Sequence, residues 1–254
     1  MKAITSSLVC CVATLVSLGS ATHVSAVPMG GSNMELEHAI GTADAKKWSC
    51  GVYTVDRQRN IDMDGDTQTM ESKKTMGYLG YSFSLYGWPR WFDTYVCAGT
   101  DKSRIGVNRY FGGNNDYGDD RFEGGVGMNF HLIDQEIADP TLFEDKLRLR
   151  GGWQLTRSSS NSGDTDTSWD ELFLHLTLSV VNDLDSNKLY LPNSIALYFG
   201  PIMSILFNTD GIERESAFGY TAGVEIYYTE DISLDVAIED MDHTDVTAGV
   251  HLRF

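Results

Sequence analysis

The chain has 254 residues and a net charge of −17, with 42% apolar and 11% aromatic side chains. An acidic chain without a basic patch is not the composition of a nucleic-acid binder, so we expect no nucleic-acid partner. Its 25 glycines, few prolines and many aromatic residues are typical of proteins built from many β-strands.

The first 26 residues have the features of a secretory signal peptide. Lys2 supplies the positive start, an apolar stretch covers residues 4–18, and Val24-Ser25-Ala26 forms a small-residue cleavage site. The apolar stretch is shorter than the roughly 20 residues of a spanning helix. We therefore expect a cleaved signal peptide over residues 1–26, followed by a flexible tail over residues 27–46.

Other interpretations of this first segment remain open. Gly19-Ser20-Ala21 is a second possible cleavage site, and a retained N-terminal anchor is an alternative. A lipoprotein signal at Cys10 or Cys11 is disfavoured, because both cysteines come before the apolar stretch is complete.

From residue 48 onward the dominant pattern is strict alternation of apolar and polar residues, which indicates β-strands. The clearest case is the segment 169–181, where one face collects Leu172, Leu174, Leu176, Leu178 and Val180. Ten segments are predicted, roughly 9–13 residues long, which suits tilted membrane-spanning strands of about 9–11 residues. They are 48–57, 76–86, 91–100, 121–132, 146–157, 169–181, 193–207, 216–228, 231–239 and 246–254.

One strand contains a proline, at Gly200-Pro201, and proline cannot donate a hydrogen bond to a strand ladder. We expect a bulge or an irregular edge at this point. Eight or twelve strands are the alternatives to ten.

The apolar faces could point inward, as in a soluble barrel, or outward into lipid, as in a membrane barrel. The predicted export signal favours lipid, and so do the connections, which are mostly long at one end of the strands and short at the other. The long connections are predicted at 60–74, 101–120, 158–168 and 208–215, with a short one at 240–245. At the opposite end 88–90 and 229–231 are short, whereas 133–145 and 182–192 are longer.

Aromatic residues also gather at that opposite end, as in the interfacial girdle of a membrane protein. The predicted girdle comprises Trp48, Trp88, Trp91, Tyr190, Tyr227, Tyr228 and Phe254.

The last strand carries the most specific motif. Val246, Ala248, Val250, Leu252 and the final Phe254 alternate with polar or small residues. This tail resembles the C-terminal signal of bacterial outer-membrane barrels, which the barrel-assembly machinery reads. From residue 48 onward the chain resembles the broad family of small outer-membrane β-barrel proteins, which includes OmpA-like, OmpW-like and opacity-protein-like barrels.

The resemblance implies an all-β, antiparallel, up-and-down transmembrane β-barrel over residues 47–254. It implies a place in the bacterial cell outer membrane among outer-membrane lipids, and assembly through the strand that ends at Phe254. It also implies a structural, adhesive or narrow-pore, porin-like role. The oligomeric state is left open.

We predict no catalytic, cofactor-binding or metal-binding residues, and no enzymatic activity, because the sequence contains no nucleophile elbow, P-loop, dinucleotide fingerprint or metal-ligand motif. The acidic segment 62–66 is not an EF-hand, since Gly65 is its fourth residue and Lys73 stands where the glutamate should be. With the acidic segments 114–120 and 163–166 it predicts solvated surface loops, and weak binding of divalent cations is the alternative.

Two other functions remain as alternatives. His243, beside Asp240, Asp242 and Asp245, is a loosely suitable site for an outer-membrane hydrolase at the extracellular rim. A secreted soluble β-barrel is the other.

Polar residues of the strands, including His131, His175 and His251, predict a charge network inside a narrow barrel, with a catalytic dyad as the less favoured reading. Cys50 and Cys97 fall on the first and third strands, too far apart for a disulfide, so we predict free thiols.

Overall fold

The computed structural model describes residues 47–63, 66–84, 91–105, 119–137, 145–160, 167–184, 192–208, 215–229 and 231–254. The predicted signal peptide and the tail over residues 27–46 lie outside these ranges. No helix within the described ranges is both long and apolar enough to cross a membrane.

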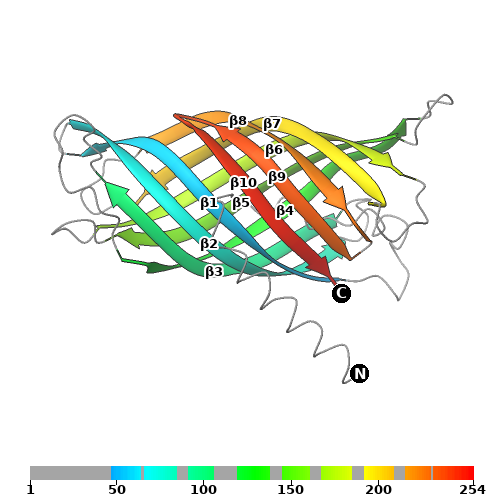
Figure 1. Cartoon of the computed structure of the whole chain (residues 1–254), viewed down its shortest axis with the longest axis horizontal. Coiled ribbons are helices and arrows are strands. Elements are labelled where there is room, and N and C mark those ends of the chain that lie inside the picture. Colours follow the sequence, from blue (N-terminus) through cyan, green and yellow to red (C-terminus); the bar gives the residue numbers. More distant parts are fainter. Residues whose placement is uncertain are drawn as a thin grey trace, which may run out of the picture.

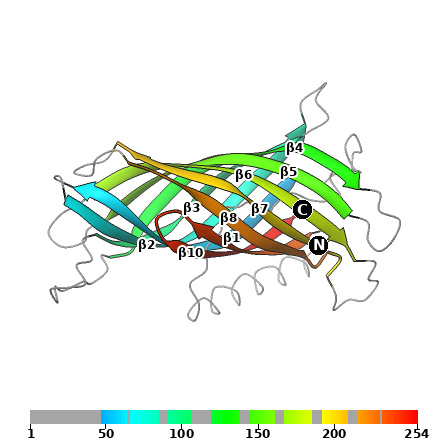
Figure 2. The ribbon, with the colours of Figure 1, turned by 90° about the horizontal axis from the view of Figure 1, so that it is seen from above.

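The described residues form ten antiparallel strands that close into one barrel in the order β1-β10-β9-β8-β7-β6-β5-β4-β3-β2 (Figures 1 and 2). Each strand pairs with its neighbours in sequence, and β1 pairs with β10 from Ser49 opposite Arg253 to Asp56 opposite Val246. The strands are β1 (Trp48–Met63), β2 (Asp66–Ser84), β3 (Trp91–Ile105), β4 (Arg121–Ile137), β5 (Asp145–Ser160), β6 (Thr167–Asp183), β7 (Ser194–Phe207), β8 (Glu215–Tyr227), β9 (Ile232–Asp240) and β10 (Thr244–Arg253).

The predicted fold class is confirmed, with ten strands rather than eight or twelve. The wall of the barrel is uneven in height. β2 has 19 residues, whereas β9 has 9 and β10 has 10. At about 3.3 Å per residue, the long strands reach well beyond the hydrocarbon of a bilayer.

The prediction of a long connection at 60–74 is wrong. β1 continues to Met63 and β2 begins at Asp66, so that Ile61 lies opposite Gln68 in a continuous ladder. The connection predicted at 158–168 is likewise shorter, because β5 runs to Ser160 and β6 starts at Thr167. The outward residues of β1 near its end, Gln58 and Asn60, are polar, so no apolar alternation marks this part of the strand.

The irregularity expected at Gly200-Pro201 is present without a bulge. Pairing of β7 with β6 lapses between Ile202 and Phe199, although the register is the same on both sides. Pairing with β8 continues through Pro201 opposite Tyr220. A shift of register occurs instead on β4, between His131 and Ile133, where the sequence gives no proline or glycine signal.

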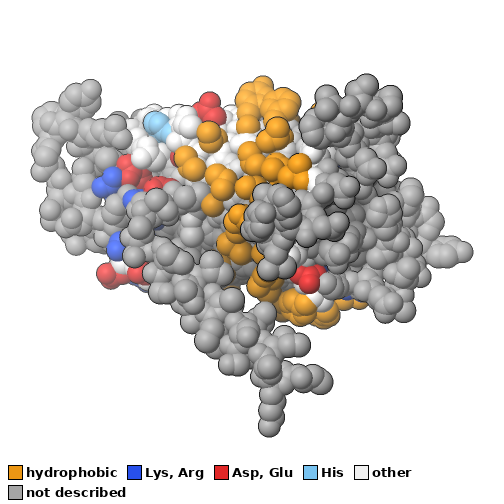
Figure 3. Space-filling view, turned by 45° about the vertical axis from the view of Figure 1, so that its right-hand side comes forward, with side chains coloured by type: hydrophobic (Ala, Val, Ile, Leu, Met, Phe, Trp, Pro, Cys, Tyr) orange, Lys and Arg blue, Asp and Glu red, His pale blue; other side chains and the backbone are white. Residues whose placement is uncertain are grey.

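Inward and outward side chains differ sharply in character. Among the described residues, buried polar and charged side chains outnumber buried apolar ones. Large apolar side chains are exposed instead, including Val96, Leu197, Phe199, Phe218 and Val236. Figure 3 shows part of this exterior as a belt of apolar side chains around the middle of the barrel, with charged groups beyond it.

Candidate functional site

The exterior of the barrel is built for lipid. An apolar surface facing outward around a polar interior is the reverse of a soluble protein and is the arrangement of transmembrane β-barrels. Closure of the sheet pairs the backbone groups that an open edge would expose to hydrocarbon. The chain is therefore a β-barrel of the bacterial outer membrane.

Charged groups mark where the apolar belt stops. On the outer wall Lys73 lies 3.7 Å from Asp56, and Arg157 lies 3.2 Å from Asp170. Both pairs lie toward the end of the barrel that carries the turn between β1 and β2, here named the β1–β2 end. The opposite end, where Trp48 pairs with Phe254, is named the Trp48–Phe254 end.

The predicted aromatic girdle at the Trp48–Phe254 end is confirmed in part. Trp48, Tyr228 and Phe254 are exposed there, and Trp48 packs edge-to-face on Tyr81, with ring centroids 5.0 Å apart. The prediction is wrong for Tyr227, because its side chain is buried in the lumen. Trp88, Tyr190 and the side chain of Trp91 lie outside the described residues.

A second aromatic group, which the sequence did not single out, lies nearer the β1–β2 end. Phe122 is 74% exposed, and Phe218 packs edge-to-face on Tyr220, with centroids 5.7 Å apart. Each sits in an alternating strand, and only the register shows that they lie toward the same end.

The lumen is the candidate functional site, and its most distinctive feature is a network of ion pairs that crosses the bore. Arg57 of β1 donates to Glu171 of β6 at 2.7 Å and to Glu239 of β9 at 2.8 Å. In the closed order β1 and β6 stand on opposite walls. The Arg57–Glu171 pair therefore spans the barrel from side to side.

Lys74 of β2 connects the network to β4. Its Nζ lies 2.9 Å from Glu123 of β4 and 3.2 Å from Glu171. Arg59 donates to Ser204, which itself donates to Glu171 at 2.6 Å. All these charged side chains are almost completely buried, and burial is tolerable only because each has a partner of opposite charge.

Above the network, at the β1–β2 end, the interior becomes apolar. Ile61, Met70, Trp169 and Leu206 form one buried cluster with contributions from β1, β2, β6 and β7. Ile61 and Trp169 come from opposite walls, and neither is exposed to solvent. The cluster therefore covers the charged network on that side.

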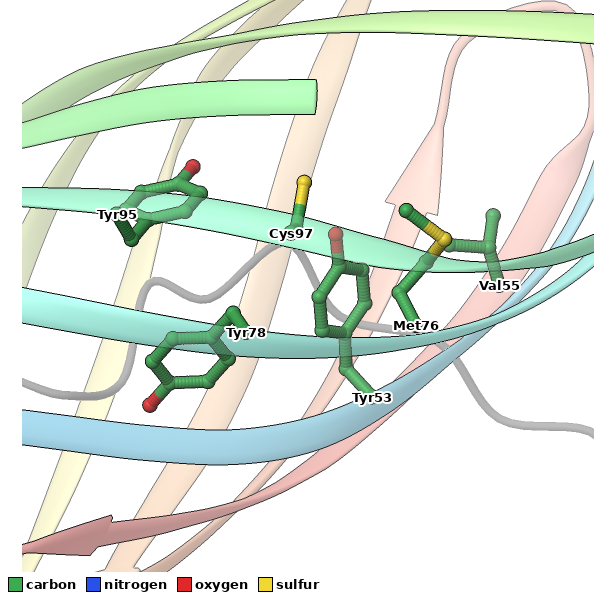
Figure 4. Packing of buried hydrophobic residues seen from close by; sticks show 6 residues of the cluster. All are labelled: Tyr53, Val55, Met76, Tyr78, Tyr95 and Cys97. Atoms are coloured by element: carbon green, nitrogen blue, oxygen red, sulfur yellow. The ribbon is translucent and has the colours of Figure 1, made fainter. Parts of the chain in front are cut away.

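Below the network, aromatic side chains fill the lumen next to β1, β2 and β3. Figure 4 shows Tyr53, Val55, Met76, Tyr78, Tyr95 and Cys97 as one packed group. The hydroxyls of Tyr53 and Tyr95 both donate to Gln154 of β5, at 3.4 and 3.1 Å.

A cavity of about 10 Å³, room for about one water molecule, lies between this group and the network. Its lining includes Tyr53, Lys74, Glu123, Gln154 and Glu171.

Nearer the Trp48–Phe254 end the lumen again becomes charged. Arg150 lies 3.3 Å from Glu225, and Tyr198 donates to Asp235 at 2.7 Å. Arg253 donates to Ser82 at 2.8 Å.

In the described strands, none of the three lumenal histidines has a carboxylate as a hydrogen-bond partner. Nε2 of His175 pairs with Asn129 at 3.1 Å, and Nδ1 of His251 pairs with Tyr78 at 2.8 Å. Both nitrogens of His131 are buried without a hydrogen-bond partner. Within the described ranges, the lumenal histidines belong to a packing network.

The carboxylates around His243 serve the backbone of β1. Asp245 accepts a hydrogen bond from the amide of Gln58 at 3.1 Å, and Asp242 accepts one from the amide of Asn60 at 3.2 Å. Nε2 of His243 is buried without a partner, so this nitrogen is not held by a carboxylate.

Cys50 and Cys97, the two cysteines within the described ranges, are free, as predicted. Cys97 points into the lumen, and Cys50 lies on the outer wall of β1, so their side chains face opposite sides of the sheet.

Of the acidic segments, 163–166 and most of 114–120 lie outside the described residues. In the first segment, Asp62 accepts a hydrogen bond from Thr67 at 2.8 Å. No group of three or more metal-ligating His, Cys, Asp or Glu side chains occurs in the part of the chain that the structure describes.

Comparison with known proteins gives remote structural similarity only. No protein-family model matches the chain, and no curated protein matches it by sequence. Among solved structures it is similar to the β domain of the Bordetella autotransporter BrkA, with a TM-score of 0.43, 11% identity, and 83% and 100% of the two chains covered.

Two other autotransporter domains give similar results. The translocator domain of NalP from Neisseria meningitidis has a TM-score of 0.38 and 8% identity over 87% of this chain and 93% of that one. The transport unit of AIDA-I from Escherichia coli has a TM-score of 0.31 and 9% identity over 85% and 92%.

Proposed function

We propose that this protein is a non-conducting anchor of the outer membrane, with a structural or adhesive role and no enzymatic activity. The observation that supports this proposal is the Arg57–Glu171 pair, which joins opposite walls of the lumen. An open aqueous channel requires a bore that side chains leave free, and this bore is crossed at the network and lined with packed aromatic groups. A barrel of this kind serves by holding its exposed parts at the cell surface.

A narrow pore is the second candidate, and single-channel recording in planar lipid bilayers separates the two. We expect the folded full-length barrel to give no steady conductance. The triple variant Arg57→Ser/Glu171→Ser/Trp169→Ala removes the cross-bore pair and the largest side chain of the apolar cluster that covers it, so conductance steps should appear.

The matched control is Arg157→Ser/Asp170→Ser, which removes an ion pair from the outer wall one residue away from Glu171 on β6. This control variant should give no conductance. Stable conductance of the unmodified barrel would contradict the proposal and favour the narrow pore.

We also propose that the barrel-assembly machinery recognises the last strand. Phe254 is 58% exposed on the outer wall, and its backbone exchanges hydrogen bonds with Trp48 at 2.9 and 3.2 Å. The strand that carries the sequence motif is thus the strand that closes the barrel. The resemblance to OmpA-like, OmpW-like or opacity-protein-like barrels remains a prediction.

A further inference from the structure

A row of oxygen-bearing side chains crosses the lumenal face of the three shortest strands. Thr221 of β8 lies directly opposite Glu239 of β9, and Glu239 lies directly opposite Asp245 of β10. Thr247 follows two residues after Asp245 on the same inward face. Directly opposed residues have Cβ atoms about 5 Å apart, so the side chain of Glu239 is within reach of both Thr221 and Asp245.

In each carboxylate of the row, one oxygen accepts a hydrogen bond and the other has no hydrogen-bond partner. One oxygen of Glu239, Oε2, accepts from Arg57 at 2.8 Å, whereas its Oε1 is buried without a hydrogen-bond partner. One oxygen of Asp245, Oδ1, accepts from the amide of Gln58 at 3.1 Å, whereas its Oδ2 is buried without a partner. Fixing one oxygen in this way orients the other for a ligand.

The two threonines supply neutral oxygens on the strands at either side of Glu239. Thr221 is 1% exposed and Thr247 is fully buried, and the hydroxyl of each lacks a hydrogen-bond partner. Buried polar atoms in proteins are nearly always satisfied. A threonine hydroxyl can accept as well as donate, so each of these oxygens can serve as a neutral ligand beside the two carboxylates.

The charge balance indicates the sign of that ligand. Arg57 is shared between Glu239 and Glu171, and Glu171 also pairs with Lys74. Asp245 makes no ion pair with any described residue. The row therefore holds two buried carboxylates against the single guanidinium of Arg57, which Glu171 also shares, and this excess of buried negative charge is costly unless a cation neutralises it.

We propose that Glu239 and Asp245, assisted by Thr221 and Thr247, bind a hard divalent cation, Ca²⁺ or Mg²⁺, inside the barrel next to the turn between β9 and β10. Oxygen-only ligands of this kind suit Ca²⁺ and Mg²⁺, whereas zinc prefers nitrogen and sulfur. Water molecules complete the coordination, as both ions allow. Bound there, the cation links β8, β9 and β10, the three shortest strands of the barrel.

The test is isothermal titration calorimetry of the folded full-length barrel in zwitterionic detergent, stripped with a chelator and titrated with CaCl₂ and separately with MgCl₂. We expect one binding site for at least one ion. Asp245→Asn and Glu239→Gln should weaken it at least tenfold, because each keeps the size of the side chain and removes its charge.

The matched control is Asp240→Asn, which neutralises an exposed outward carboxylate adjacent to Glu239 and should bind like the unmodified protein. As a second readout, the ion should raise the temperature at which the folded gel band is lost in the unmodified protein and in the control, but not in Asp245→Asn.

Absence of binding to the unmodified barrel would overturn the proposal. So would equal binding by Asp245→Asn, because it would place the ion elsewhere. If Glu239→Gln fails to fold, Asp245→Asn decides the question, since its remaining carboxamide oxygen can still accept the amide of Gln58.

Discussion

Gly223 on β8 lies directly beneath the ring of Tyr198 on β7. A Cβ built at this position would overlap the ring, whose hydroxyl is fixed by Asp235 at 2.7 Å. Gly127 is related in the same way to the ring of Tyr95. In both cases a glycine provides the space for a large inward side chain of the neighbouring strand.

The change Gly223→Ala should therefore destabilise the barrel by about 1–3 kcal/mol, the usual cost of overpacking a filled interior. Urea unfolding in lipid vesicles, followed by tryptophan fluorescence, measures this difference. Gly77→Ala is the matched control, because the nearest atoms to its Cβ are backbone oxygens 3.8 Å away, and it should change stability by less than about 0.5 kcal/mol. Equal effects at both positions would contradict the packing argument.

At the scale of one strand, β6 shows how alternation sorts side chains between two environments. Leu176 is exposed on the outer wall, whereas its neighbours His175 and Thr177 are buried in the lumen. The sequence predicted this alternation, because lipid and lumen impose opposite polarity on successive residues. It did not predict the upper ends of β1 and β2, where outward residues such as Gln58 and Asn60 are polar and no apolar alternation marks the strand.

The variant Leu176→Arg tests whether the outer wall faces lipid. An arginine on the lipid face near the bilayer midplane costs about 2–4 kcal/mol, so refolding into lipid vesicles should be less favourable by that amount. Thr100→Arg is the control, since Thr100 lies outward on β3 beside the charged Lys102 and should cost about 0–1 kcal/mol. Tolerance of arginine at 176 would point to an aqueous exterior and to the soluble-barrel alternative.

At the scale of the whole molecule, stability depends on the seam between β1 and β10. Ala248 lies opposite Thr54 in the middle of the seam. Proline at this position removes a ladder hydrogen bond and opens an edge that lipid cannot satisfy.

We expect the unboiled unmodified protein to run as a fast, compact band on a gel and the boiled protein as a slow one. Ala248→Pro should abolish the fast band, and the control Ala248→Ser should retain it. A fast band that survives proline at this position would show that the seam does not determine closure.

The sequence by itself determined the ten strands and the two faces of their spanning parts, because a period of two residues is a local property of the chain. The tertiary structure alone decided which inward residues meet. Arg57 and Glu171 are 114 residues apart, and Arg57 and Glu239 are 182 apart. Their contact depends on strand number, register and stagger together, which closure of the barrel fixes and no local pattern contains. The same holds for the oxygen row of Thr221, Glu239 and Asp245, whose members look unremarkable until three strands align.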